Sequence, residues 1–300
     1  MPVHPSFLRY RGDGRTAPGC PPQRRGEQGS YLADKDLVLA VNTALAVGQP
    51  LLLTGEPGTG KTMLAWSVAS ELGLGDVLEF HTRSDHQARD TLYSFDNLRR
   101  FYDAQNRDPR AEDLNHYVRL EPLGQAIASP TQRVVLIDEI DKAPRDFPND
   151  LLDELDAMKF LVHETGVEYR AAIRPVVIIT SNSERQLPAP FLRRCVFHHI
   201  AFPSRERLEQ ILAERLGHLQ LSDGLAKAAI MRFEELRRLD GWEKLPATSE
   251  LLSWVRVLLA ASIDEAEIKS GALATLPLLS ALVKTRADLE RLAGPARRAA

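Results

Sequence analysis

The sequence predicts an α/β fold with a parallel, doubly wound sheet, followed by an all-helical region. Short apolar runs typical of buried strands alternate with segments of helical periodicity as far as residue 203, which is the pattern of a parallel sheet with helices on its faces. A glycine-rich string joins the first apolar run to a helix. Beyond Pro203 apolar residues recur only at helical spacing. We therefore place a domain boundary near residue 203.

The first region, residues 31–203, begins its ordered part near Tyr31. Buried strands are predicted at residues 51–53, 77–80, 134–137, 175–181 and 196–202. Helices are predicted at residues 37–46, 61–69, 92–102, 123–128 and 146–158. Residues 103–116 are charged, which indicates a surface insertion, and Glu164-Thr-Gly between two short apolar runs indicates a β-hairpin.

Both ends of the chain differ from this core. Residues 1–30 are rich in Pro, Gly and Arg and have few apolar anchors, which predicts a flexible arm. Residues 204–300 carry helical stripes and no strand signal, which predicts a separate helical domain. Its helices are expected at residues 204–217, 223–239, 248–264 and 271–293.

Composition narrows the class of protein. The chain is 44% hydrophobic and 26% charged, with a net charge of −3, as is ordinary for a soluble globular protein. A protein whose main task is gripping nucleic acid is usually basic, so that class is disfavoured. No apolar run approaches the length of a membrane span, and no secretory signal is apparent. A cytoplasmic protein is the expectation.

The string GEPGTGKT, Gly55 to Thr62, has the spacing of a phosphate-binding loop. Its glycines let backbone N–H groups turn inward around a polyphosphate, next to the positive end of the following helix. Lys61 is expected to reach the β- and γ-phosphates, and the Thr62 hydroxyl to hold Mg²⁺. The ligand is therefore a nucleoside triphosphate, although the loop does not distinguish ATP from GTP. The predicted binding residues are Glu56, Pro57, Gly58, Thr59, Gly60, Lys61 and Thr62.

A second motif supplies two carboxylates. The apolar run 134–137 ends in Asp138 and Glu139. In a nucleotide hydrolase the first acid supports Mg²⁺ and the second polarises the attacking water. Because strand residues alternate in direction, neighbouring acids can take these different tasks.

Three blocks in order, GEPGTGKT, VVLIDEIDKAPRDFPNDLLDELD and VVIITSNSERQLPAPFLRRC, resemble the AAA+ ATPases and, within them, the MoxR-like group. The resemblance covers roughly residues 31–264. It implies a P-loop NTPase core with a five-stranded sheet between helical layers, a helical lid, and ATP bound between the two and again between ring neighbours. Residues 81–116 and the hairpin near Glu164 match two insertions of that group.

The resemblance also assigns roles to single residues. Asn182 matches the sensor 1 position, which orients the attacking water. Arg193 and Arg194 match the place of the arginine finger that reaches into a neighbouring subunit's site. Arg194 is the favoured finger, because Arg-Cys here resembles the clamp-loader motif, and Arg193 stays an alternative. One departure is Glu250, which stands about where many relatives carry a sensor 2 arginine.

These features together predict a Mg²⁺-dependent ATPase that forms a ring, expected to be a hexamer, and remodels a partner protein in a chaperone-like way. The resemblance implies a partner with a von Willebrand factor A domain. Two alternatives stay open. The first is a nucleotide-gated scaffold with little hydrolysis, favoured by the missing sensor 2 arginine. The second is a DNA-remodelling protein, which the net charge disfavours.

Overall fold

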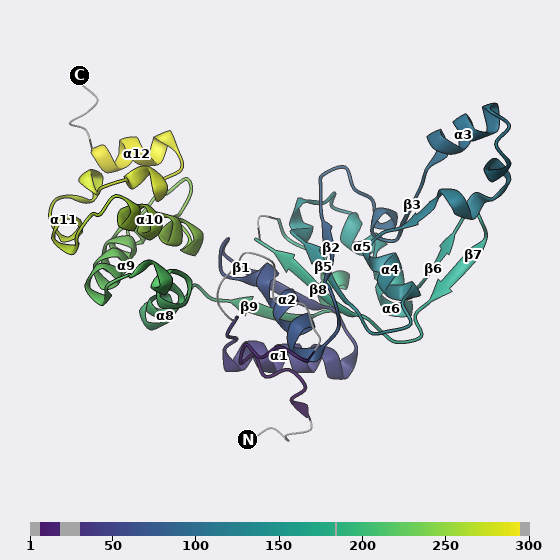
Figure 1. Ribbon diagram of the computed structural model, residues 1–300, viewed down its shortest axis with the longest axis horizontal. Helices are drawn as coiled ribbons and strands as arrows, with labels where there is room; N and C mark the ends of the chain where they lie inside the picture. Colours follow the sequence, from purple (N-terminus) through teal and green to yellow (C-terminus); the bar gives the residue numbers. More distant parts are fainter. Residues whose placement is uncertain (1–6, 19–30, 184, 295–300) are drawn as a thin grey trace. The chain divides into compact units, whose positions relative to one another are not determined.

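The computed structural model describes residues 7–18, 31–183 and 185–294. It divides into two compact units. The first contains the described residues up to Gly55 and the segment Gly60–Ile200, and the second contains Glu56–Thr59 and the chain from Ala201 onward. The predicted fold class is confirmed, because a parallel sheet with flanking helices is followed by an all-helical region (Figure 1).

The first unit is built on a sheet of five parallel strands in the order β2-β5-β8-β1-β9. Each predicted strand is present, and the bounds are β1 Leu51–Gly55, β2 Leu78–His81, β5 Val134–Asp138, β8 Val176–Ser181 and β9 Val196–Ile200. Because all five strands run in one direction, their carboxyl ends meet at one edge of the sheet. That edge is where ligands bind in open α/β sheets.

Alternating strand residues bury two separate cores, one on each face of the sheet. Leu51 and Leu53 of β1 pack with α1 (Lys35–Val47) and α2 (Lys61–Leu72). Leu52 faces the opposite core. That core is shared with α4 (Pro122–Ala128), α5 (Phe147–Asp150), α6 (Leu152–Ala157) and α7 (Ala189–Leu192). The unit therefore has three layers, with the sheet between two layers of helices (Figure 1).

Residues 7–18 fall in the stretch whose composition predicts a flexible arm, and they are packed instead. Tyr10 is fully buried in the core of α1 and α2, and its hydroxyl lies 2.8 Å from Ser67 Oγ. Asn42 Oδ1 accepts from the Tyr10 N–H at 3.0 Å, and Asn42 Nδ2 donates back to the Tyr10 carbonyl at 2.7 Å. Burial of the Tyr10 side chain therefore holds this segment against the core, although few of its other residues are apolar. The rest of the predicted arm lies outside the described residues.

Residues 88–120 contain more regular structure than predicted. The helix expected at 92–102 is wrong in its first half, because β3 (Tyr93–Phe95) pairs antiparallel with β4 (Val118–Leu120). The helix α3 (Asn97–Gln105) starts only after Asp96, whose side chain accepts from the Arg99 N–H at 2.9 Å. Short 3₁₀ turns occupy Ala88–Thr91, Pro109–Glu112 and Leu114–Tyr117.

The helix predicted at 146–158 is divided at Leu151 into α5 and α6. It ends at Met158, which adopts a left-handed conformation with φ 46°. The expected β-hairpin follows and is confirmed, with β6 (Lys159–Val162) antiparallel to β7 (Val167–Arg170).

The second unit is helical, as predicted, and α8 (Arg205–Leu216) and α9 (Asp223–Arg237) lie close to the predicted bounds, whereas α10 (Thr248–Ala260) ends before the predicted residue 264. Trp254 is fully buried in its core and donates from Nε1 to the Pro277 carbonyl at 2.8 Å. Within the described residues, no helix is long and apolar enough to span a bilayer.

The long helix predicted at 271–293 is wrong. Residues 271–293 fold as 3₁₀ turns at Leu273–Thr275 and Leu279–Ala281 and the short helix α12 (Arg286–Ala293), and a separate helix, α11 (Glu265–Lys269), precedes them. Gly271 has φ 84°, and Pro277 precedes Leu278 at φ 54°. A proline and two left-handed residues interrupt helical hydrogen bonding, although the apolar side chains keep helical spacing.

Candidate active site

The predicted phosphate loop connects the carboxyl end of β1 to the first turn of α2. Gly58 and Gly60 have φ values of 76° and 92°, which favour glycine. A Cβ at Gly60 would lie 3.1 Å from Cε2 of Tyr31, so a side chain there would be both strained and crowded. Thr59 closes the turn, and its hydroxyl donates to the Glu56 carbonyl at 2.8 Å. The glycines are therefore required by the loop's own conformation.

Lys61, the first residue of α2, is 6% exposed. Its Nζ donates to the Gly55 carbonyl at 2.7 Å. A buried ammonium group needs such partners, because removal from water without them is unfavourable. The side chain thus lies across the loop, beside a helix N-terminus, where an anion is stabilised.

Asp138 ends β5 and receives two hydroxyl groups on one oxygen. Thr62 Oγ1 donates to Asp138 Oδ1 at 3.1 Å, and Thr180 Oγ1 donates to the same atom at 2.6 Å. His81, the register partner of Asp138 in β2, places Nδ1 3.5 Å from Oδ2. The predicted metal-binding pair, Thr62 and Asp138, is therefore in direct contact.

Glu139 follows in a left-handed conformation with φ 56°. That conformation costs a residue other than glycine of order 1–3 kcal/mol and persists only where the surroundings hold it. The Glu139 N–H donates to Thr180 Oγ1 at 2.8 Å. Its carboxylate accepts from Asn182 Nδ2 at 2.9 Å and also binds Lys142 Nζ. The predicted base and the predicted sensor are thus hydrogen-bonded to each other.

The residues present fit a magnesium ion bound mainly through a nucleotide. The Thr62 hydroxyl and the Asp138 carboxylate offer adjacent hard oxygen donors, which Mg²⁺ prefers. Among the described residues no group of three or more His, Cys, Asp or Glu side chains could hold a metal. An all-protein cage is therefore lacking there, and Mg²⁺ sites of the nucleotide type need only one or two protein ligands beside the phosphates.

Arg193 and Arg194 lie elsewhere in the first unit. They follow α7 and precede β9, so they stand at the amino ends of the strands, whereas Asp138 and Glu139 stand at the carboxyl ends. Both are exposed, and Arg194 Nε lies 2.8 Å from Asp156 Oδ2. The structure therefore does not bring the predicted arginines to the Asp138–Glu139 cluster of the same chain.

Glu250 has a structural task in the second unit. It is the third residue of α10, and its carboxylate accepts from the Ala247 N–H at 3.1 Å and from the Ser249 hydroxyl at 3.0 Å. A carboxylate in the first turn accepts hydrogen bonds from free N–H groups and interacts favourably with the positive end of the helix dipole. The departure from the sensor 2 arginine is therefore explained locally by helix capping.

Three polar residues that contact the carboxylates were not predicted from the sequence: His81, Lys142 and Thr180. Strand register gives the signal for His81, because Asp138 pairs with it across β2 and β5. Lys142 lies three residues after Glu139, within reach on a helical turn. Thr180 stands in an apolar β-branched run, where a threonine is ordinarily a strand former.

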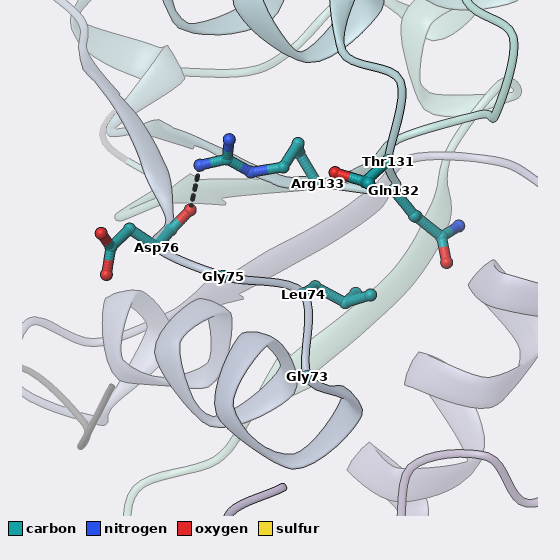
Figure 2. Close-up of a pocket in the computed structure, with 7 residues that line it drawn as sticks. All are labelled: Gly73, Leu74, Gly75, Asp76, Thr131, Gln132 and Arg133. Carbon is teal, nitrogen blue, oxygen red and sulfur yellow. Dashed lines mark hydrogen bonds between the residues drawn. The ribbon is translucent and has the colours of Figure 1, made fainter. Parts of the chain in front are cut away.

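A shallow pocket of about 430 Å³ lies away from this cluster (Figure 2). It is lined by the end of α2 and by residues that precede β2 and β5, among them Arg133, which donates to the Asp76 carbonyl at 2.9 Å. Those residues stand at the amino ends of the strands. The pocket is therefore at the opposite edge of the sheet from Asp138 and Glu139.

A family model and solved structures match the chain. No curated protein shows significant sequence similarity to the chain. A candidate ATPase from Cytophaga hutchinsonii is similar in structure, with 15% identity and a TM-score of 0.40; the match covers 66% of this chain and 62% of that one. The model of the ATPase family associated with various cellular activities (AAA) matches residues 51–204, just over half of the chain. The chain therefore belongs to the AAA family of ATPases.

Proposed function

We propose that the protein hydrolyses ATP with Mg²⁺, at the site where the first turn of α2 meets the carboxyl end of β5. One observation carries the proposal: the residues predicted to hold the metal, Thr62 and Asp138, are in contact, and so are the predicted base and sensor, Glu139 and Asn182. Lys61 starts α2 beside them. Distant segments of the sequence supply this set, so chance proximity is a poor explanation.

Each residue has a physical task in this proposal. The backbone N–H groups of the loop and the Lys61 ammonium bind the phosphate oxygens by charge. Thr62 and Asp138 hold Mg²⁺, which when bound would neutralise charge on the terminal phosphates. ATP rather than another nucleotide is proposed from the family alone.

Glu139 is the proposed general base. It accepts a proton from the attacking water, and the Asn182 amide holds its carboxylate in position. The Lys142 ammonium pairs with the same carboxylate. Because both partners of that pair are partly exposed, water competes for it and the pairing is weak. The base is therefore accessible to a water molecule.

Phosphate release and nucleotide binding test this proposal together. Glu139→Gln keeps the shape of the side chain but not its basicity, so it should bind a fluorescent ATP analogue normally and lose at least about 100-fold in turnover. Lys61→Ala should lose binding itself. The exposed Glu290 of α12 offers a matched control, and Glu290→Gln should equal wild type. Wild type without nucleotide affinity in the presence of Mg²⁺ would refute the proposal.

We also infer that the enzyme works as a ring, expected to be hexameric, in which Arg194 or Arg193 of one subunit completes a neighbour's site. Their place at the opposite edge of the sheet supports action in trans. The exposed Arg194–Asp156 pair is worth at most about 1 kcal/mol, so it can be exchanged for a phosphate. A MoxR-like chaperone function in the cytoplasm, on a partner with a von Willebrand factor A domain, follows from the sequence resemblance.

A second candidate function is a nucleotide-gated scaffold that binds ATP and barely hydrolyses it. Glu250 favours it, because its carboxylate caps α10 where many relatives carry a catalytic arginine. Under this alternative, wild type and Glu139→Gln would release phosphate at equal, very low rates. DNA-stimulated turnover that falls steeply with salt would instead favour DNA remodelling.

A further inference from the structure

Thr180, the fifth residue of β8, stands between the two carboxylate residues of the site. Its side chain is buried, with 1% of the residue exposed. Oγ1 lies 2.6 Å from Asp138 Oδ1 and 2.8 Å from the Glu139 backbone nitrogen. A single hydroxyl group therefore contacts the proposed metal-binding carboxylate and the backbone of the proposed base.

The direction of both hydrogen bonds follows from chemistry. A backbone N–H can only donate, so Oγ1 accepts from Glu139. The hydroxyl has one hydrogen, which then goes to Asp138 Oδ1, and a bond of 2.6 Å to a carboxylate is of the strong, charge-assisted kind. Thr180 thus fixes Asp138 as an acceptor and satisfies the amide of Glu139 at the same time.

The second bond matters because Glu139 has a left-handed backbone. Such a conformation needs surrounding contacts to hold it, and the hydrogen bond to Thr180 holds the backbone N–H of Glu139 itself. The conformation also aims the Glu139 carboxylate at Asn182. Loss of the hydroxyl would leave a partly buried N–H unsatisfied and loosen this arrangement.

We propose that Thr180 is a positioning residue, whose hydroxyl couples the orientation of the Mg²⁺-binding Asp138 to the backbone of the base Glu139. The inference rests on the proposed function. It predicts that Mg²⁺ affinity and turnover fall together when the hydroxyl is removed. A residue that merely fills the core would change stability alone.

Thr180→Val is the direct test, because valine keeps the shape and removes only the hydroxyl. Turnover should fall about 10- to 100-fold, as is usual for partners that orient a metal ligand. Mg²⁺ affinity is measured separately, with a non-hydrolysable ATP analogue. The Mg²⁺ concentration needed for half-maximal binding of this analogue should rise about tenfold. Thr180→Ser should restore both to within about threefold, because the hydroxyl returns.

Thr91→Val is the matched control. Thr91 is fully buried, and its hydroxyl donates to the Ala88 carbonyl at 2.7 Å outside the carboxylate cluster. It should change thermal stability but not Mg²⁺ dependence. If Thr180→Val does not fold, Thr180→Ala takes its place. Hydrogen exchange at the Glu139 amide is then measured, and it should be faster in this variant than in wild type because the hydroxyl is absent.

Two failures can be told apart. If wild type binds and hydrolyses ATP while Thr180→Val matches Thr91→Val in Mg²⁺ half-saturation and turnover, this inference is overturned and the proposed function stands. If wild type itself neither binds nor hydrolyses nucleotide, the proposed function fails and takes the inference with it.

Discussion

Glu139 is the residue on which the proposed chemistry depends, and its surroundings explain how it is held. The left-handed backbone is fixed through Thr180, and the carboxylate lies between the Asn182 amide and the Lys142 ammonium. These contacts come from β8, from the residue that follows it and from the turn after β5. A change in Asn182 or Lys142 should affect turnover more than nucleotide binding, because the proposed binding contacts are those of the phosphate loop.

Asn182→Ala tests this separation. The variant removes the amide that donates to Glu139 Oε1 at 2.9 Å, so turnover should fall roughly 10- to 100-fold while affinity for an ATP analogue changes little. Stopped-flow binding and phosphate release measure the two quantities. Asn149→Ala on the exposed surface of α5 is the control. Equal losses of binding and turnover would contradict the assigned role.

The buried thiol of Cys195 allows a prediction of how its reactivity depends on pH. Burial, with a smaller contribution from Asp156, raises the pKa of this thiol to about 12, from an ordinary value near 9. Only the thiolate reacts with disulfide reagents. In a Cys20→Ser background the labelling rate should therefore keep rising about tenfold per pH unit beyond pH 9. A rate that levels off near pH 9 would show an exposed, ordinary thiol.

Sequence motifs predict the residues that we propose to bind phosphate and metal, but they do not predict Thr180. Lys61, Thr62, Asp138 and Glu139 stand in strings whose spacing is set by a ligand. Thr180 is different, because a β-branched residue in a buried strand is expected on packing grounds alone. Its hydrogen bonds depend on β5 and β8 being neighbours, which the sequence does not state.

At the element scale, prediction succeeds where burial is complete and fails where apolar spacing is ambiguous. All five strands of the main sheet were predicted, because parallel strands covered on both faces are continuous apolar runs. β3 was predicted as helix, since Leu92, Phe95 and Leu98 recur at helical spacing. Antiparallel pairing with β4 overrode that spacing. The prediction of one long helix at residues 271–293 was wrong for a similar reason, because Gly271 and Pro277 interrupt a segment whose apolar residues keep helical spacing.

Asp288 on α12 allows a stability test of the helical unit. Burial alone would raise the pKa of this carboxyl, but hydrogen bonds from the Glu243 N–H, the Thr285 hydroxyl and the Lys244 N–H lower it below its usual 3.8. Ionised Asp288 therefore stabilises the fold above about pH 3.8, and this contribution is lost as the pH falls through the lowered value.

Asp288→Asn should reduce the free energy of unfolding by about 1–3 kcal/mol at pH 7. The variant replaces one acceptor oxygen by an NH₂ group, which cannot accept a hydrogen bond from the neighbouring N–H and O–H groups. Urea unfolding from pH 7 down to pH 3 measures the difference between wild type and variant. The gap should narrow at the acid end. A gap that is constant with pH would mean that the charge of Asp288 contributes nothing.

For the whole molecule, the division into a sheet-based unit and a helical unit follows from the spacing of apolar residues, since strand signals end near Pro203. Assembly does not follow from that spacing. The location of Arg193 and Arg194 supports it, because they stand at the amino ends of the strands, at the opposite edge from Glu139. An arginine that serves catalysis from there must serve another subunit.

Mixing two inactive variants tests whether a neighbouring subunit completes the site. Glu139→Gln lacks the base but keeps its arginines, and Arg194→Ala lacks the favoured finger but keeps the base. Each alone should release phosphate slowly, whereas an equimolar mixture should recover a substantial part of wild-type turnover, because some intact sites then meet intact arginines. The double variant Glu139→Gln/Arg194→Ala, mixed with Arg194→Ala, should recover nothing.

The same measurement with Arg193→Ala decides which arginine acts. A site completed by a neighbouring subunit predicts recovery in the Glu139→Gln and Arg194→Ala mixture. Full activity of Arg194→Ala and Arg193→Ala on their own, or a mixture no more active than its separate components, would contradict a site completed by a neighbouring subunit.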